Sequence, residues 1–158
     1  MPLEIERKFL LKGDTVPPAV ATEPIEQGYI AVTDDGTEVR LRRIAGQCVL
    51  GIKRGISGLS RVEVELDLSD AQFEELWPAT AGARLVKTRH SVRLHDTLAY
   101  VDVYAQGLSG LRTVEVEFPS EESARAFTPP DWFGPEITGA QEYKNRHLAT
   151  QGIPDTVS

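Results

Sequence analysis

The feature that most restricts how this chain can fold is a strict alternation of charged and apolar side chains along its extended segments. In the first segment, Glu4, Glu6 and Lys8 alternate with Ile5 and Phe9. Successive side chains of a β-strand point to opposite faces, so each such segment is predicted to be a strand with one charged and one apolar face. The predicted strands span residues 3–11, 37–44, 47–54, 61–68, 84–94, 98–105 and 111–118.

The charges on these strands come as pairs of like sign, two residues apart. The pairs are Glu4/Glu6, Arg40/Arg42, Glu63/Glu65, Lys87/Arg89 and Glu115/Glu117, with Lys53 and Asp102 as single charges. An ordinary solvated sheet face is the alternative interpretation for any one strand. Like charges on one face repel, so the full set indicates that a ligand neutralises them. Carboxylate pairs suit a hard divalent cation, and guanidinium and ammonium groups suit phosphate oxygens.

Helical segments are available to cover the apolar face of the sheet. Ser69 and Gln72 form a capping-box pattern before Phe73, Leu76 and Trp77, and Ser120 precedes a second short helix. A further capping box, Thr138 with Gln141, is predicted to open a C-terminal helix over 139–150, followed by Gly152. If helices cover the apolar face, the charged face becomes the wet interior of a barrel.

Composition narrows the class of protein further. The 158 residues suit a single domain over 1–158, and the net charge of −7 disfavours binding to nucleic acid. One cysteine excludes a disulfide framework and favours a cytoplasmic setting. Charges begin at Glu4, and no apolar run reaches membrane-spanning length, so neither a signal peptide nor a membrane segment is expected.

The ordered set of charged motifs resembles the CYTH domains, the triphosphate tunnel metalloenzymes. The resemblance runs from EIERKF (4–9) through EVRLRR (38–43), GIKR (51–54), RVEVEL (61–66), LVKTRHSV (85–92), VDVY (101–104) and VEVEF (114–118) to EYKNRHLA (142–149). It implies an α+β fold: a closed eight-stranded antiparallel β-barrel with helices outside and a C-terminal helix at one tunnel end. The strand still missing is placed near 24–32. The likeness is greatest to short bacterial members that act on inorganic tripolyphosphate.

Roles for individual residues follow from the charge pattern together with this resemblance. Glu4, Glu6, Glu115 and Glu117 are the predicted ligands of Mg²⁺ or Mn²⁺. Glu63 and Glu65 hold a second ion, orient the attacking water, or only balance the tunnel's cations. The predicted phosphate-binding set is Lys8, Arg40, Arg42, Lys53, Lys87 and Arg89, with Asp102 on the same face.

Other residues are open to two interpretations. Tyr29, in the family's GYI position, orders a phosphate or water, or is only a half-buried strand tyrosine. Lys144 is a lid residue of the C-terminal helix or an exposed helix lysine. Arg43 and Arg54 alternate out of phase with the inward set and are expected outside, whereas Arg93 is in phase and reaches the tunnel mouth.

Hydrolysis of tripolyphosphate is the function these features favour, with a small-molecule triphosphate as the partner. An adenylyl cyclase of class IV type or a nucleoside or thiamine triphosphatase on the same fold is the first alternative. A non-catalytic polyphosphate-binding module is the second, although it would not need three Glu-x-Glu pairs. No insert that could hold a base is visible, which favours an inorganic substrate. A homodimer is left open.

Overall fold

The computed structural model describes residues 3–55 and 60–155 of the chain. These residues form nine strands: β1 (Leu3–Leu11), β2 (Ala21–Val32), β3 (Glu38–Ile44), β4 (Gln47–Gly55), β5 (Ser60–Leu68), β6 (Arg84–Leu94), β7 (Thr97–Tyr104), β8 (Arg112–Glu117) and β9 (Phe133–Glu136). Every strand pairing is antiparallel, in the order β5-β4-β3-β2-β6-β7-β8-β1-β9.

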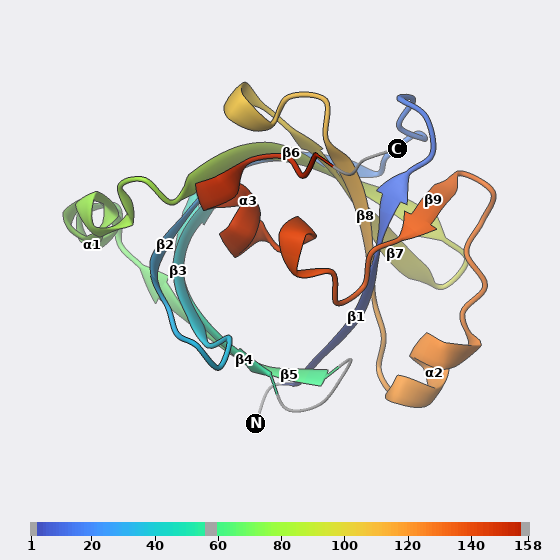
Figure 1. Cartoon of the computed structure of the whole chain (residues 1–158), viewed down its shortest axis with the longest axis horizontal. Coiled ribbons are helices and arrows are strands. Elements are labelled where there is room, and N and C mark those ends of the chain that lie inside the picture. The colour runs from blue at the N-terminus through green and yellow to red at the C-terminus, as the bar shows by residue number, and fades with distance from the viewer. Residues whose placement is uncertain (1–2, 56–59, 156–158) are drawn as a thin grey trace.

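An additional pairing between β1 and β5 closes the sheet into a barrel of eight strands, with β9 outside it. Figure 1 looks down this barrel and shows the strands as a ring. The predicted closed antiparallel barrel is therefore confirmed. The strand expected near 24–32 is β2, whereas β9 is not among the predicted strands.

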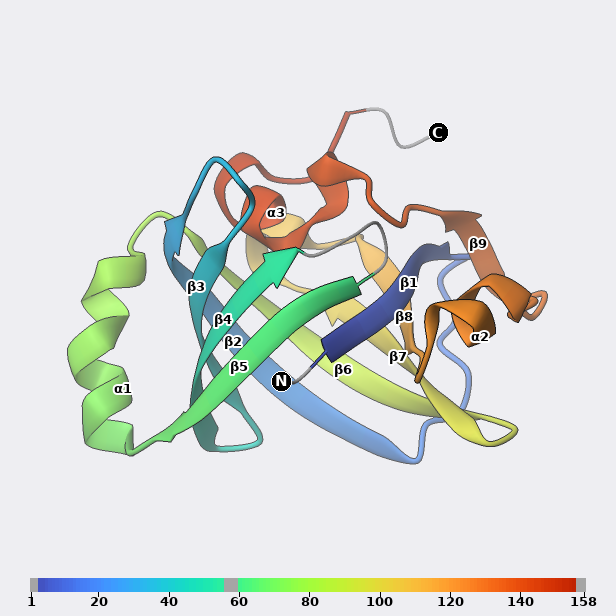
Figure 2. The ribbon, with the colours of Figure 1, turned by 90° about the horizontal axis from the view of Figure 1, so that it is seen from below.

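The helices are short and lie in two kinds of place. They are α1 (Asp70–Leu76), α2 (Glu121–Ala126) and α3 (Asn145–Gln151), with 3₁₀ turns η1 (Trp77–Thr80), η2 (Gln106–Leu108) and η3 (Gln141–Tyr143). Figure 1 shows α1 and α2 outside the ring, while η3 and α3 lie across its opening. Figure 2 shows from the side that α3 sits at one end of the barrel. No helix among the described residues is long and apolar enough to cross a membrane.

Two of the predicted helix caps are confirmed and one is wrong. Ser69 with Gln72 forms a capping box at α1, and Ser120 caps α2. Thr138 caps nothing, because η3 begins after Ala140 and α3 after Lys144, neither with a side-chain cap. The Thr138 hydroxyl instead accepts a hydrogen bond from the backbone N–H of Lys8 at 2.9 Å and donates to Glu136 at 2.7 Å. The C-terminal segment is thus fixed to β1 before its helix starts.

Apolar side chains pack mainly on the outer surface of the barrel and at its covered end. One cluster lies where β1, β7 and β8 meet β9, and includes Phe9, Val101 and Phe133. A smaller cluster of Leu41, Cys48 and Phe73 lies beneath α1. A third, which includes Leu85, Tyr104 and Leu148, packs under α3 at the covered end. The core therefore lies around the barrel and leaves much of the interior to polar groups.

Candidate active site

Ion pairs that skip a strand show which side chains face the barrel interior. Lys53 Nζ on β4 lies 3.0 Å from Glu4 on β1, although β5 separates those strands. Arg40 on β3 reaches Glu63 on β5 at 3.0 Å, across β4. On β4, Gly51 is the register partner of Arg40, and an added Cβ there would lie 3.4 Å from Arg40 Nε. The guanidinium therefore lies against the backbone of β4, with no side chain between.

A cavity of about 70 Å³ lies inside the covered end of the barrel. It is lined by six cationic side chains, three carboxylates and a buried tyrosine hydroxyl, together with part of the C-terminal segment. These ten polar residues are Lys8, Arg40, Lys53, Arg61, Lys144, Arg146, Glu6, Glu38, Glu115 and Tyr29. The excess of cations suits a polyanion, because charge-assisted hydrogen bonds to phosphate oxygens are the strong ones.

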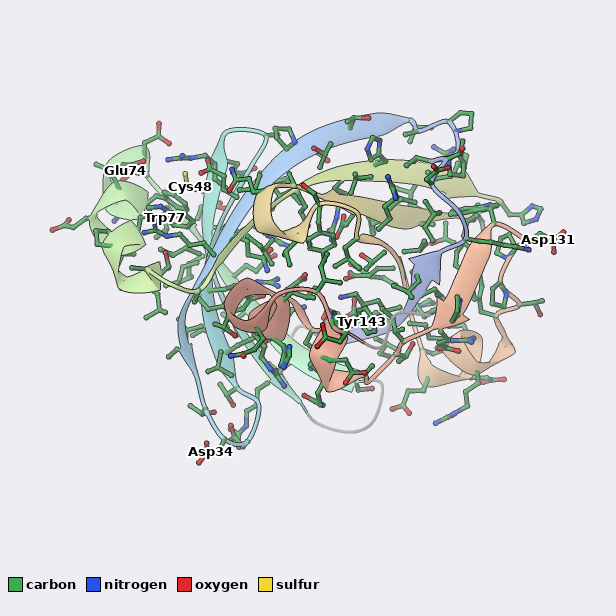
Figure 3. All side chains as sticks on the ribbon, turned by 45° about the horizontal axis from the view of Figure 1, so that its top comes forward. Asp34, Cys48, Glu74, Trp77, Asp131 and Tyr143 are labelled. Atoms are coloured by element: carbon green, nitrogen blue, oxygen red, sulfur yellow. The ribbon has the colours of Figure 1, made fainter. Side chains whose placement is uncertain are left out.

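The C-terminal segment closes this cavity through bonds to the barrel. Lys8 Nζ donates to the backbone carbonyl of Tyr143 at 2.7 Å. Arg146 donates to the carbonyl of Gly36 at 3.1 Å and to Glu38 at 3.2 Å. Figure 3 places Tyr143 over the barrel opening, far from Trp77 at the start of η1. Burial, with Arg61 and Arg146 nearby, lowers the pKa of Lys144 to about 8.

A second group of buried charges lies away from this cavity and pairs two cations with one carboxylate. Asp102 is fully buried, and one of its oxygens lies 2.8 Å from Lys87 Nζ. Arg89 donates to both oxygens of the same carboxylate, at 2.8 and 2.9 Å. Burial lowers the pKa of Lys87 to about 8, while Arg89 and Lys87 outweigh burial to hold the pKa of Asp102 below its usual value. None of these three residues lines the cavity.

Four carboxylates were predicted to hold a metal ion, and the structure brings Glu6 and Glu115 together at the cavity wall. Burial and the hydrogen-bonded neighbour Glu115 raise the pKa of Glu6 to about 8. Burial opposes ionisation of Glu115, but Lys8 and Arg89 hold its pKa well below the usual range. Within 3–55 and 60–155, no group of three or more acidic, histidine or cysteine side chains is arranged to hold a metal. One ionised and one proton-retaining carboxylate remain available to a cation.

The remaining predicted residues take distinct positions. Glu4 and Glu63 contact Lys53 behind the cavity wall, and Arg42 pairs with Glu65 at 3.1 Å. Glu117 lines a separate cavity of about 370 Å³ together with Arg93 and Tyr100. Arg43 lies outside, as expected, where it pairs with Glu26 and Glu74. Arg54 is exposed.

Several residues of the site were not predicted from the sequence. Glu38 and Arg61 lie in phase with Arg40 and Glu63, so the strand alternation contained the signal for both. Arg146 reaches the cavity from a short helix, and no pattern marked it. Gln27 is completely buried and donates to the hydroxyl of Tyr29 at 2.6 Å. A neutral glutamine carried no charge signal, yet it lies inside the barrel.

Comparison with known proteins points to one group of enzymes. No protein-family model matches the chain. An inorganic triphosphatase of Nitrosomonas europaea is 47% identical over 148 residues, which cover 92% of this chain and 96% of the relative. An inorganic triphosphatase of Acetivibrio thermocellus is 30% identical over 146 residues, covering 92% of both.

Solved structures agree with these sequence relatives. A crystal structure of an inorganic triphosphatase superposes with a TM-score of 0.70 at 42% identity, covering 98% of this chain and 99% of the other. A Hippeastrum protein with a dominant triphosphatase activity superposes with a TM-score of 0.57, covering 78% of this chain and 83% of its own. Its identity is only 16%, so it supports the fold alone.

Proposed function

This chain belongs to the CYTH family of triphosphate tunnel enzymes, among its inorganic triphosphatases, and we propose that it hydrolyses inorganic tripolyphosphate to pyrophosphate and orthophosphate. The observation that carries the proposal is the cavity at the covered end of the barrel. Its six cations exceed its three carboxylates, and Tyr29 adds a hydroxyl. A linear triphosphate offers oxygens along its whole length to such a wall, and no part of it needs an apolar pocket.

The residues that touch the cavity have separable tasks in the reaction. Arg40 and Lys53 are held in place by Glu63, with Arg40 at 3.0 Å and Lys53 at 3.7 Å, and both face the cavity. We assign them to the phosphates, where fixed cations stabilise charge that develops on the transferred phosphoryl group. Lys8 is bonded to Tyr143 in this structure and would turn to a phosphate oxygen on binding.

Water is the second reactant, and the carboxylates near the cations are the groups that can orient it. Glu63 faces the interior beside Arg40 and Lys53, and burial raises its pKa. Glu65 is bonded to Arg42 further along the same strand. We propose that Glu63 is released from Arg40 and Lys53 when these cations bind phosphate and then, with Glu65 behind it, orients the water for in-line attack on a terminal phosphorus. Lys87, Arg89 and Asp102 would act on the substrate only through the field they create, because they do not line the cavity.

The carboxylates suit Mg²⁺ or Mn²⁺, and we propose such an ion as the cofactor. Glu6 and Glu115 would supply oxygens to it, and Glu4 and Glu117 complete the predicted set. Mg²⁺ characteristically takes only one or two carboxylates and fills its remaining positions with water and substrate phosphates, so a closed cage of three protein ligands is not required. When bound, the ion supplies positive charge that stabilises the phosphoryl oxygens. The raised pKa of Glu6 reflects its burial first and the repulsion from Glu115 second.

No observation favours the alternative functions. A cyclase or a nucleotide triphosphatase must place a base beside the triphosphate. At the covered end, Ile137, Tyr143 and Asn145 of the C-terminal segment occupy the cavity rim. A binding module without turnover would not need the carboxylates that crowd Glu6. Cytoplasmic location and a homodimer remain predictions, and light scattering during gel filtration measures the second.

Steady-state kinetics on tripolyphosphate, ATP and pyrophosphate at saturating Mg²⁺ test the proposed function. We expect kcat/KM for tripolyphosphate to exceed that for ATP by about a hundredfold, or about 2.7 kcal/mol of transition-state stabilisation. EDTA should abolish phosphate release, and Mg²⁺ or Mn²⁺ should restore it. Cyclic AMP as the main product from ATP, or ATP cleaved as well as tripolyphosphate, contradicts the proposal. Full activity in metal-free buffer contradicts the cofactor assignment alone.

A further inference from the structure

Gln27 is a fully buried polar side chain that the reaction described above does not use. It lies on the inward face of β2, two residues before Tyr29, so both side chains point into the barrel. Its Nε2 donates to the Tyr29 hydroxyl oxygen at 2.6 Å. Its Oε1 has no hydrogen-bond partner among the described residues. The side chain is thus bonded through one end only.

This arrangement is poorly explained by stability. A buried acceptor without a partner lowers the free energy of unfolding, and a methionine of similar length would bury no polar atom. Burial without full satisfaction is typical of groups kept for function rather than for folding. The one bond that Gln27 makes is to Tyr29, which lines the cavity. We therefore look for the role of Gln27 at the Tyr29 hydroxyl.

The hydroxyl oxygen of Tyr29 accepts a hydrogen bond from Gln27, and Arg40 is a neighbouring cation. A phenol that accepts from the Gln27 amide nitrogen cannot donate its own proton to that nitrogen, so the proton points elsewhere. Burial raises the pKa of Tyr29, with Glu38 adding to the effect, so the group stays protonated at ordinary pH. Tyr29 lines the cavity, so its proton can be directed at a ligand there.

We propose that Gln27 is a positioning residue that fixes Tyr29 as a hydrogen-bond donor to a phosphate oxygen of the substrate. The inference rests on the proposed function for the identity of that oxygen. Without Gln27, the hydroxyl could rotate and accept from a cation of the wall, and its proton would no longer be directed at the substrate. Preorganised donors of this kind contribute because they need no rearrangement during the reaction.

A double-mutant cycle tests the inference. The proteins are wild type, Gln27→Met, Tyr29→Phe and the double variant, each measured for kcat/KM on tripolyphosphate, for tripolyphosphate affinity by calorimetry and for melting temperature. We expect Gln27→Met to lower kcat/KM about tenfold, the equivalent of one lost hydrogen bond. In the Tyr29→Phe background the same change should have almost no further effect, because the group that Gln27 positions is already gone. The melting temperature of the Gln27→Met variant should equal or exceed that of the wild type.

Thr113→Val is the matched control. Thr113 is also fully buried in the barrel with an unbonded hydroxyl, but it does not contact Tyr29, so its removal should leave activity unchanged. Losses that multiply in the double variant, or a lowered melting temperature that accounts for the lost activity, would show that Gln27 is only structural. If the wild type fails to cleave tripolyphosphate, the proposed function fails. The calorimetric affinities of the four proteins then still decide the role of Gln27 in binding it.

Discussion

Two groups of inward cations differ in the structure although the sequence presents them alike. Arg40 and Lys53 face a cavity and share Glu63 with each other. Lys87 and Arg89 share Asp102, which is fully buried, and neither faces the cavity. Arg40 and Lys53, here called the cavity cations, can still bind a ligand. Lys87 and Arg89, here called the buried cations, have most of their charge neutralised by groups of the protein.

The difference shows that strand alternation determines which face of the sheet a side chain lies on, but not whether an inward side chain reaches the cavity. Lys87 lies 5.4 Å from the centre of the Tyr104 ring, and the hydroxyl of Tyr104 bonds to Asn145 of α3. Leu85 and Leu148 pack in the same cluster. The C-terminal segment therefore seals this part of the interior, and a charge there must find its partner within the protein.

The largest expected effect concerns the partner of the buried cations. Asp102→Asn removes the negative charge that Lys87 and Arg89 share, and among the described residues leaves Lys87 without an ion pair and Arg89 with only Glu115, at 3.8 Å. Breaking a buried ion pair in this way costs about 3–5 kcal/mol, so we expect a corresponding loss in the free energy of unfolding. Urea denaturation measures it, with Glu65→Gln as the control, because Glu65 is more exposed and its pair with Arg42 is solvated. If Asp102→Asn and Glu65→Gln had equal free energies of unfolding, the buried ion pairs would contribute no more to stability than a solvated one.

The cavity cations should affect activity rather than stability. Arg40→Ala should lower kcat/KM for tripolyphosphate at least tenfold, since a charge-assisted bond to phosphate contributes about 1.5–3 kcal/mol. The protein should stay folded, because the lost side chain faces a wet cavity. Arg43→Ala is the matched control, since Arg43 lies on the same strand but outside the barrel.

Lys87→Met sharpens the same comparison. Asp102 keeps its two bonds from Arg89 in this variant, so folding should survive and the loss of activity should be smaller than for Arg40→Ala. A loss as large as that of Arg40→Ala, at an unchanged melting temperature, would place Lys87 among the groups that bind phosphate. That outcome would support the sequence-based prediction for Lys87 over the structural placement.

The sequence predicts which strand residues face the barrel interior, but not which of them reach the cavity. The inward phase of Glu6, Lys8 and Arg40 could be predicted because alternation is a local property of the chain. The sealing of Lys87 could not, because it depends on Tyr104 and on a C-terminal segment about forty residues further along. Thr138 looked like a cap by local pattern, but a tertiary bond to β1 took its hydroxyl.

The carboxylates at the cavity predict a dependence on pH that magnesium should shift. Burial and Glu115 raise the pKa of Glu6 to about 8, so this group contributes stability at low pH that is lost as pH rises from about 4.5 through 8. A proton on Glu6 competes with a cation. At limiting Mg²⁺, kcat/KM should therefore rise as pH passes 8, and saturating Mg²⁺ should move the midpoint to lower pH. Glu6→Gln should lose this response, and a midpoint that ignores Mg²⁺ contradicts the assignment.

The smallest expected effect concerns Lys144, at the rim between the cavity and the C-terminal segment. Burial and the nearby Arg61 and Arg146 lower its pKa to about 8, so it is mostly cationic at pH 7 and mostly neutral at pH 9. The native state then binds fewer protons than the unfolded state between about 8 and 10.5, and this group's contribution to the free energy of unfolding rises across that window. Lys144→Met should raise KM for tripolyphosphate about threefold at pH 7, which corresponds to a partly solvated ion pair of about 0.7 kcal/mol. At pH 9 the two proteins should have nearly the same KM, because the wild-type group has lost its charge, whereas Lys144→Arg should keep the lower KM at both values. A Lys144→Met effect that persists undiminished at pH 9 would mean that the side chain acts through packing of the segment and not through its charge.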